Sequence, residues 1–306
     1  MTSFIRHLAI LCLCLMTYAQ AWAQQAVIAV VSPESSGVYR ELIEAMRGEI
    51  ERQRPGQITF AVGATPPSPS SPAPRLVVTV GVVALTAALE ARENSTPILA
   101  TLIPRLRFER ETLRFGRTTK ISAIVIDQPA SRQAALIRAA LPKVRRVGLL
   151  LGPESKLQAT SLSSALAEHD MSPFVREPGK GGLFSALQDV LEESDALLAV
   201  ADATVFNSES ITNILTAAYR RQIPLVGFSP SYVKAGAVLG LYATPTQMGR
   251  AAAIAALAAI NGDALPSPAP ARQFSIEINQ AVARSLGLSL DEDQIRKRMH
   301  ALESRK

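Results

Sequence analysis

The chain has 306 residues, of which 48% are hydrophobic and 19% charged, and its formal net charge is +6 at pH 7. A chain this apolar can bury enough surface to offset the entropy lost on folding, so global disorder is excluded. The composition also excludes a collagen-like chain and a disulfide scaffold, and the length allows one large or two medium domains.

The first 23 residues are predicted to be a secretory signal peptide. Arg6 precedes the apolar stretch 8–19, and Ala21-Trp22-Ala23 gives the small-x-small cleavage pattern. Because this stretch is shorter than the ~20 residues that span a bilayer, an uncleaved anchor is the weaker alternative. Cleavage near Ala23 would place a mature chain of residues 24–306 in the periplasm.

Cysteine and histidine usage argues against metal and thiol chemistry. Both cysteines, Cys12 and Cys14, lie in the predicted signal peptide, so the mature chain would have no disulfide. The remaining histidines, His169 and His300, have no zinc-binding spacing, and His169 is expected at the surface near the end of a helix. With no G-x-S-x-G elbow and no Gly-rich phosphate loop, we expect no catalytic residues, no cofactor and no metal.

Apolar strands alternate with amphipathic helices along the whole mature chain. The first half contains expected strands at 27–31, 58–62, 76–80 and 97–102, and helices at 38–52 and 82–92. Between the second and third strands, residues 64–75 contain five prolines and predict a surface loop. The second half contains expected strands at 121–126, 144–151, 174–176, 196–200 and 224–228, and helices at 130–141, 155–169, 183–191, 207–221 and 246–260.

This alternation is typical of βαβ units and parallel sheets covered by helices on both faces. The strands are too many for one comfortable sheet, so the predicted fold class is α/β, with two Rossmann-like lobes and a hinge cleft between them. Lobe 1 is expected to contain residues 24–126 and about 232–263. Lobe 2 is expected to contain residues 127–231 and about 264–306.

Polar loops follow several of the expected strands, at 32–37, 81–83, 152–155, 202–204 and 229–232. In open parallel sheets, ligands bind beyond the carboxyl ends of the strands. The Ser, Thr, Asp and Glu side chains of these loops could bind a polar ligand, with helix N-termini favouring its anionic part. The alternative is that the same side chains cap the helices that follow.

A basic run occupies residues 105–120. It consists of Arg105, Arg107, Arg110, Arg114, Arg117 and Lys120, moderated by two glutamates. Nucleic acid is not an expected partner, because the chain is predicted to be exported. The simplest interpretation is a solvated surface, and the alternative is a docking face for an acidic partner or a membrane surface.

The C-terminal third contains a recognisable order of segments. Residues 223–228 (IPLVGF) are followed by 233–237 (VKAGA), by Gly249 in an alanine-rich helix, and by 260–266 (INGDALP). This order resembles the ABC-transporter substrate-binding proteins of the tryptophan/tyrosine type, which have the type I periplasmic-binding fold. Upstream segments similar to the same family are 81–84 (GVVA), 141–148 (LPKVRRVG) and 202–205 (DATV).

The resemblance implies a monomeric periplasmic solute-binding protein that closes over a small ligand and delivers it to an ABC permease. An amino-acid-like ligand is one candidate, but the family's amino-acid specificity does not carry over to this chain. The positions that match the family's ligand loops are Val82, Val83, Glu154, Ser155, Asp202, Thr204 and Ser229. The carboxylates of Glu154 and Asp202 would suit a ligand ammonium group.

The sequence also departs from the family pattern. The proline-rich segment 64–75 stands where the family has a helix, Ile103-Pro104-Arg105 replaces an Asp-Pro, and Ala203 replaces an asparagine. These departures support an alternative function, in which the binding fold is a periplasmic sensor or a receptor's partner module without a transport role. The basic run would then be the face that contacts the membrane receptor.

Overall fold

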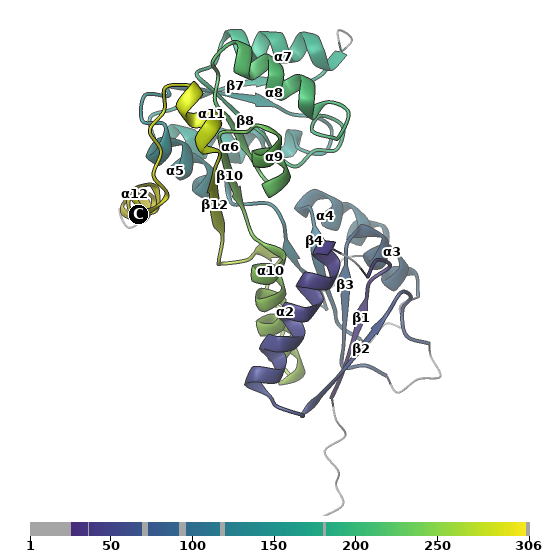
Figure 1. Ribbon diagram of the computed structural model, residues 1–306. Helices are drawn as coiled ribbons and strands as arrows, with labels where there is room; N and C mark the ends of the chain where they lie inside the picture. The colour runs from purple at the N-terminus through teal and green to yellow at the C-terminus, as the bar shows by residue number, and fades with distance from the viewer. Residues whose placement is uncertain are drawn as a thin grey trace, which may run out of the picture.

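The computed structural model describes residues 26–35, 37–68, 73–91, 96–116, 120–179 and 182–303. The predicted signal peptide, with Cys12 and Cys14, lies outside these residues. The described chain forms two six-stranded sheets, each flanked by helices, and the sheets are the cores of two separate lobes (Figure 1). The predicted two-lobed α/β class is therefore confirmed.

The sheet of the first lobe is entirely parallel. Its strand order is β11 (Ala269–Pro270), β5 (Ile121–Val125), β4 (Ile98–Ile103), β3 (Leu76–Val80), β1 (Ala26–Val31) and β2 (Ile58–Gly63). One face is covered by α2 (Gly37–Gln53) and α10 (Pro245–Ile260), the other by α3 (Val82–Glu90) and α4 (Arg105–Arg114). Successive side chains of β1 point to opposite faces of the sheet. Ile28 packs with α2 and α10 on one face, and Ala29 packs with α3 on the other.

The sheet of the second lobe has one antiparallel strand at its edge. Its order is β12 (Ser275–Ile278), β10 (Leu239–Tyr242), β9 (Leu225–Gly227), β8 (Ala196–Leu198), β6 (Arg146–Leu150) and β7 (Ser172–Arg176), with β12 antiparallel to β10. One core contains α5 (Ala130–Ala140), α6 (Ala159–Ala167) and α12 (Glu292–Glu303), and the other contains α7 (Gly182–Glu192) and α8 (Ile211–Arg220). The remaining short helices are η1 (Lys156–Gln158), α9 (Pro230–Ala235) and α11 (Gln280–Ser285).

The chain passes between the lobes after β5, after β10 and after β11. These crossovers differ from the expected lobe boundaries. The segment 232–242 pairs with β9 and belongs to the second lobe, whereas β11 returns to the first lobe beside β5, beyond the expected boundary near 263. The difference arises because strand pairing joins distant parts of the chain and has no local sequence signal.

The structure adds a helix in the basic run and corrects one expectation. Residues 105–114 of the basic run form α4, which buries Phe108 against the first sheet. His169, expected at the surface, is buried, and its backbone carbonyl accepts hydrogen bonds from the Arg138 guanidinium. The described parts of the proline-rich segment, 64–68 and 73–75, form neither helix nor strand, as predicted.

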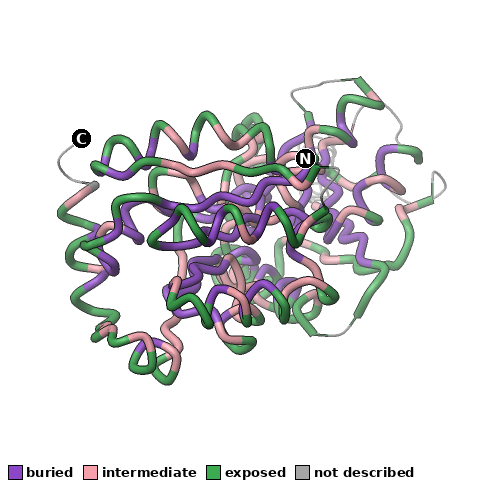
Figure 2. The backbone as a smooth tube through the Cα atoms, turned by 90° about the horizontal axis from the view of Figure 1, so that it is seen from above, coloured by how far each residue is buried: buried purple, intermediate pink, exposed green. Residues whose placement is uncertain are grey.

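Each lobe has two hydrophobic clusters, one on each face of its sheet. Figure 2 shows the buried backbone inside the molecule, with exposed segments around it.

Within the described residues, no helix combines the length and the apolar character needed to cross a bilayer.

Helices α2 and α10 pack unusually closely in the first lobe (Figure 1). Gly249 is the reason, since a Cβ atom at this position would lie 2.3 Å from the carbonyl oxygen of Leu42 and 3.0 Å from the Cβ of Ala45. The contact is therefore backbone against backbone, and it tolerates no side chain at position 249.

We expect Gly249→Ala to destabilise the protein by about 1–3 kcal/mol, because the added methyl must push the two helices apart. Urea unfolding of residues 24–306 measures this change. Gly48→Ala is the matched control, since Gly48 lies in α2 with open space around it, and alanine there should stabilise the helix by about 0.5–1 kcal/mol. Equal stability of the two variants would contradict the close contact.

Candidate functional site

The two lobes face each other through the carboxyl ends of their parallel strands (Figure 1). The loops that follow β3, β6, β8 and β9 all begin at this edge, which is where ligands bind in open α/β sheets. The sequence-predicted residues of these four loops therefore lie at the interlobe edge, on two neighbouring lobes.

In the second lobe, the carboxylate of Asp202 joins two of these loops. Its Oδ2 accepts hydrogen bonds from the backbone N–H of Glu154 (3.0 Å) and the hydroxyl of Ser155 (2.8 Å). Its Oδ1 accepts from the backbone N–H (3.0 Å) and the hydroxyl (2.6 Å) of Thr204. The two oxygens of the Asp202 carboxylate thus accept four hydrogen bonds from the protein, which occupy their acceptor positions.

Asp202 is 2% exposed, and burial alone would raise its pKa. The hydrogen bonds from Thr204, Ser155 and Glu154 outweigh that effect, and the pKa is lowered below its ordinary value. The ionised carboxylate is therefore the form that the fold stabilises.

Gly152 allows the two loops to meet. A Cβ atom there would lie 2.3 Å from the Thr204 hydroxyl oxygen and 2.7 Å from the Oδ2 of Asp202. The backbone N–H of Gly152 also donates to the hydroxyl of Ser155 (3.1 Å). The predicted residues Ser155, Asp202 and Thr204 thus form one hydrogen-bonded unit with Gly152.

Glu154 reaches from this unit toward the first lobe. Its carboxylate accepts a hydrogen bond from the backbone N–H of Ala203 (3.1 Å) and forms an ion pair with Arg107 of α4 (3.3 Å). The ion pair connects the two lobes at their facing edges. The side chain of Glu154 remains partly exposed, so its charge is accessible from the interlobe space.

The other predicted residues border the same edge. Val82 and Val83 open α3 directly after β3, and Val83 is 69% exposed. Ser229 is half-buried at the start of α9, next to the aromatic cluster of Phe206, Phe228 and Tyr232. The hydroxyl of Tyr232 donates to the carbonyl of Phe206 (2.9 Å), and burial raises its pKa to about 12, so it stays protonated.

The sequence did not indicate a mainly apolar hollow with a few polar side chains, which lies beside the first crossover. A small cavity of about 20 Å³ lies between residues 126–128, Gln133 and the ends of β8 and β9, with Phe228 in its wall. The side-chain nitrogen of Gln128 and the side-chain oxygen of Gln133 are buried there without a hydrogen-bond partner. One buried donor and one buried acceptor at a cavity of this size suit a water molecule or a small polar ligand group.

The position of Gln133 could have signalled this hollow, because it is the one polar side chain among the buried residues of α5. Nothing in the sequence distinguishes Gln128 from other loop residues.

Several residues of the basic run form hydrogen bonds or ion pairs with other residues of the same chain. The backbone N–H of Arg105 donates to Asp127 (2.6 Å), its guanidinium donates to the carbonyl of Pro268 (2.9 Å), and Arg114 pairs with Glu111 (3.0 Å). Burial raises the pKa of Asp127, partly opposed by that hydrogen bond from Arg105. Arg117 lies outside the described residues.

Among the described residues, no group of three or more His, Cys, Asp or Glu side chains could hold a metal ion. The geometry at the interlobe edge is that of a binding site with fixed polar loops, an accessible carboxylate and aromatic faces.

Comparison with known proteins agrees with this geometry. A family model described as ABC transporter substrate-binding protein matches residues 74–300. The chain belongs to this family. The family is one of binding proteins rather than enzymes, so the resemblance and the non-catalytic role expected from the sequence are both confirmed.

Solved structures with the same fold are similar over nearly their whole length. An ABC domain from Streptococcus pneumoniae in complex with L-Trp is 15% identical (TM-score 0.61), and the match covers 89% of this chain and 98% of that one. A ligand-free, open substrate-binding protein with adhesive properties from Clostridium difficile is 15% identical (TM-score 0.67; 88% and 97%). A conserved domain protein from Vibrio cholerae is 19% identical (TM-score 0.60; 89% and 98%).

These likenesses place the chain in the type I periplasmic-binding fold that the sequence predicted. No curated protein sequence matches the chain.

We expect Asp202→Asn to destabilise the protein by about 2–4 kcal/mol at pH 7, because the amide nitrogen cannot accept the two hydrogen bonds of one carboxylate oxygen. The wild-type contribution is present above the unfolded pKa near 3.8 and is lost as pH falls through the lower folded pKa. Urea unfolding between pH 7 and pH 3 should therefore show a smaller loss of stability in acid for the variant than for the wild type.

Asp189→Asn is the control for this substitution, because Asp189 forms only an exposed 3.5 Å ion pair with Arg176. Its effect should stay below about 1 kcal/mol. If the two variants were equally stable, the Asp202 hydrogen bonds would not hold the loops together.

Proposed function

We propose that the protein is a periplasmic solute-binding receptor that captures a small molecule between its lobes and delivers it to an ABC permease. The observation that carries this proposal is the interlobe edge itself. Fixed polar loops of the second lobe lie opposite the start of α3 and α4 in the first, with one ion pair between Arg107 and Glu154. A site divided between two lobes suits a ligand that is enclosed when the lobes close.

Within this proposal, the predicted ligand-binding residues have two different roles. Asp202, Ser155 and Thr204 position the loops through their mutual hydrogen bonds. The predicted residues left to contact the ligand are Glu154, Ser229 and the backbone around Val82 and Val83. The structure adds the partly exposed ring of Phe228 and the unpartnered side-chain groups of Gln128 and Gln133 as further candidate contacts.

The ligand class that fits these contacts is a small cationic or zwitterionic molecule with an apolar body. Glu154 supplies a negative charge, for which a ligand ammonium group would compete with Arg107, and the rings of Phe228 and Tyr232, with centroids 4.5 Å apart, supply an apolar face. The L-Trp complex of the pneumococcal relative supports an amino acid as the first candidate.

The cellular setting is part of the same proposal. The pattern of Arg6, the apolar stretch 8–19 and the small-x-small residues before Gln24 supports cleavage near Ala23 and a periplasmic mature protein. An ABC permease is the proposed membrane partner, and the receptor is proposed to act as a monomer.

A thermal-shift screen of residues 24–306 tests the proposal, with amino acids, nucleosides, sugars and small organic acids as ligands. A specific ligand at 100 times its Kd should stabilise the folded protein by about 2.7 kcal/mol, which appears as a higher Tm. A flat screen would contradict the receptor function and favour the alternative of a module that contacts a membrane sensor.

We further expect Glu154→Gln to weaken the binding of a stabilising amino acid by roughly tenfold, because the ligand ammonium group loses its opposite charge. The amide oxygen can still accept the hydrogen bond from Ala203, so the loop should keep its conformation. Isothermal titration measures the affinity, and Glu193→Gln, which removes an exposed carboxylate from the ion pair with Arg146, is the matched control. Unchanged affinity in Glu154→Gln would mean that the ammonium group binds elsewhere.

A further inference from the structure

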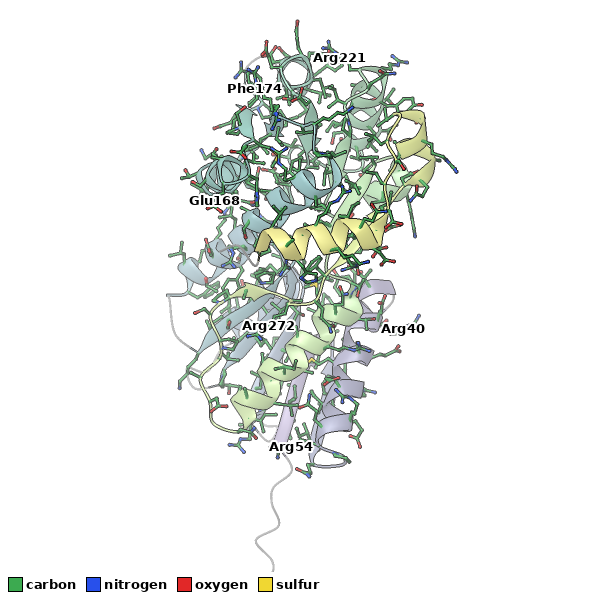
Figure 3. The ribbon with its side chains drawn as sticks, turned by 90° about the vertical axis from the view of Figure 1, so that its left-hand side faces the viewer. Arg40, Arg54, Glu168, Phe174, Arg221 and Arg272 are labelled. Atoms are coloured by element: carbon green, nitrogen blue, oxygen red, sulfur yellow. The ribbon has the colours of Figure 1, made fainter. Side chains whose placement is uncertain are left out.

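A second concave surface lies on the first lobe, away from the interlobe edge. It is a groove of about 950 Å³ between α10 and the return segment 264–273, which runs back along the helix to β11 (Figure 3). We call it the α10 groove. Ile124 of β5 lies at its floor, and Arg272 marks the return segment in Figure 3.

The groove exists because small side chains line it. α10 contributes Ala251, Ala255 and Ala258, and the return segment contributes mainly alanine and proline. Ile254 of α10 is 60% exposed at the same place. Since isolated globular proteins seldom leave a contiguous apolar hollow open, this surface is a candidate binding site.

The two ends of the groove differ in charge. Arg250 lies one turn from the start of α10, and Arg272 lies near the end of the return segment. Arg250 and Arg272 lie at the same end of the groove. Gln247, three residues before Arg250, donates a hydrogen bond to the hydroxyl of Ser275, three residues after Arg272 (3.2 Å), and this contact brings the two segments together. At the opposite end, around Ala258 and Pro266, the groove is lined by small apolar side chains and by Arg52, whose charge is paired with that of Glu49.

The guanidinium groups of Arg250 and Arg272 are exposed, and the described residues place no carboxylate within ion-pair distance of either. Glu49 also borders the groove, but it is already bound to Arg52 at 2.5 Å. That hydrogen bond, followed by one from Gln53, lowers the pKa of Glu49 and keeps it ionised. Arg250 also acts electrostatically on Glu49, beyond ion-pair distance. The polar end therefore has two exposed guanidinium groups, neither of them in an ion pair with a described residue, that can bind a carboxylate in bidentate geometry.

We propose that the α10 groove binds a monomeric amphiphilic carboxylate, with its apolar body against the alanines of α10 and its head group at Arg250 and Arg272. The volume of the groove falls within the ~300–1,000 Å³ typical of small-molecule sites. The two arginines that form no ion pair with a described residue lie at one end of the groove, which matches a ligand with one anionic head group. A docked protein would instead need a broad surface of ~800 Å² on each partner. The groove is a site in addition to the proposed receptor function and does not depend on it.

Isothermal titration of residues 24–306 with decanoate, below its micelle-forming concentration, tests the proposal. Decyltrimethylammonium has the same chain with the opposite charge, and acetate has the head without the chain. We expect saturable binding of decanoate, roughly tenfold weaker binding of the cationic analogue, and no measurable binding of acetate.

Three variants locate the site. The double variant Arg250→Gln/Arg272→Gln should weaken decanoate binding roughly tenfold by removing the head-group contacts. Ala251→Leu should weaken it comparably by filling the hollow, while the helix keeps a good helix-forming residue. Arg40→Gln, on an exposed position of α2 remote from the groove (Figure 3), should bind as the wild type does. The Tm of each variant verifies that it folds.

Several results would overturn the proposal. These are no binding of decanoate, equal binding of the anionic and cationic analogues, or unchanged affinity in both groove variants. Loss of decanoate binding in Arg107→Gln alone, which removes the cationic partner of Glu154, would assign it to the interlobe edge instead. A dimer that dissociates in Ala251→Leu, measured by light scattering, would show that a second copy of the chain occupies the groove.

Discussion

The interlobe edge of the second lobe depends on one buried carboxylate. Asp202 accepts four hydrogen bonds from two loops that follow the neighbouring strands β6 and β8. A buried charge without partners would be costly, so both loops have to adopt the conformation that satisfies it. Gly152 is the complementary constraint, since only a residue without a side chain lets the loops approach this closely. The result is a preorganised polar edge, which needs little ordering when a ligand binds.

Contacts between the lobes come from residues that local patterns describe poorly. Arg107 pairs with Glu154 across the facing edges, and Arg105 binds Asp127 on the first crossover and the carbonyl of Pro268 on the return segment. The basic run therefore fixes α4 relative to two connecting segments. These partners reduce the charge that remains for an external protein, which weakens the case for a docking face on α4.

The sequence was sufficient for the parts of the fold that have local periodicity. Leu76–Val80 is apolar throughout and is buried throughout, as expected for a central parallel strand. α4 was missed because most of its residues are charged and Phe108 is its one buried large apolar side chain. β10 and β12 have four residues each, too few for a clear alternation, and the lobe boundaries depend on their pairing. At the site, the sequence located Asp202 at the correct edge, but its internal hydrogen bonds depend on a loop 47 residues away.

The close contact at Gly249 has a consequence for how the chain folds. Helix α2 is made near the start of synthesis, but its partner α10 follows some 200 residues later, as the Thr246–Glu41 hydrogen bond illustrates. Until then, the part of α2 that faces α10 is uncovered, and the first sheet lacks its edge strand β11. The N-terminal lobe thus has a high contact order and completes itself only after the second lobe has been synthesised. For a chain exported as proposed above, this delay would keep the first lobe incomplete until the whole polypeptide is available.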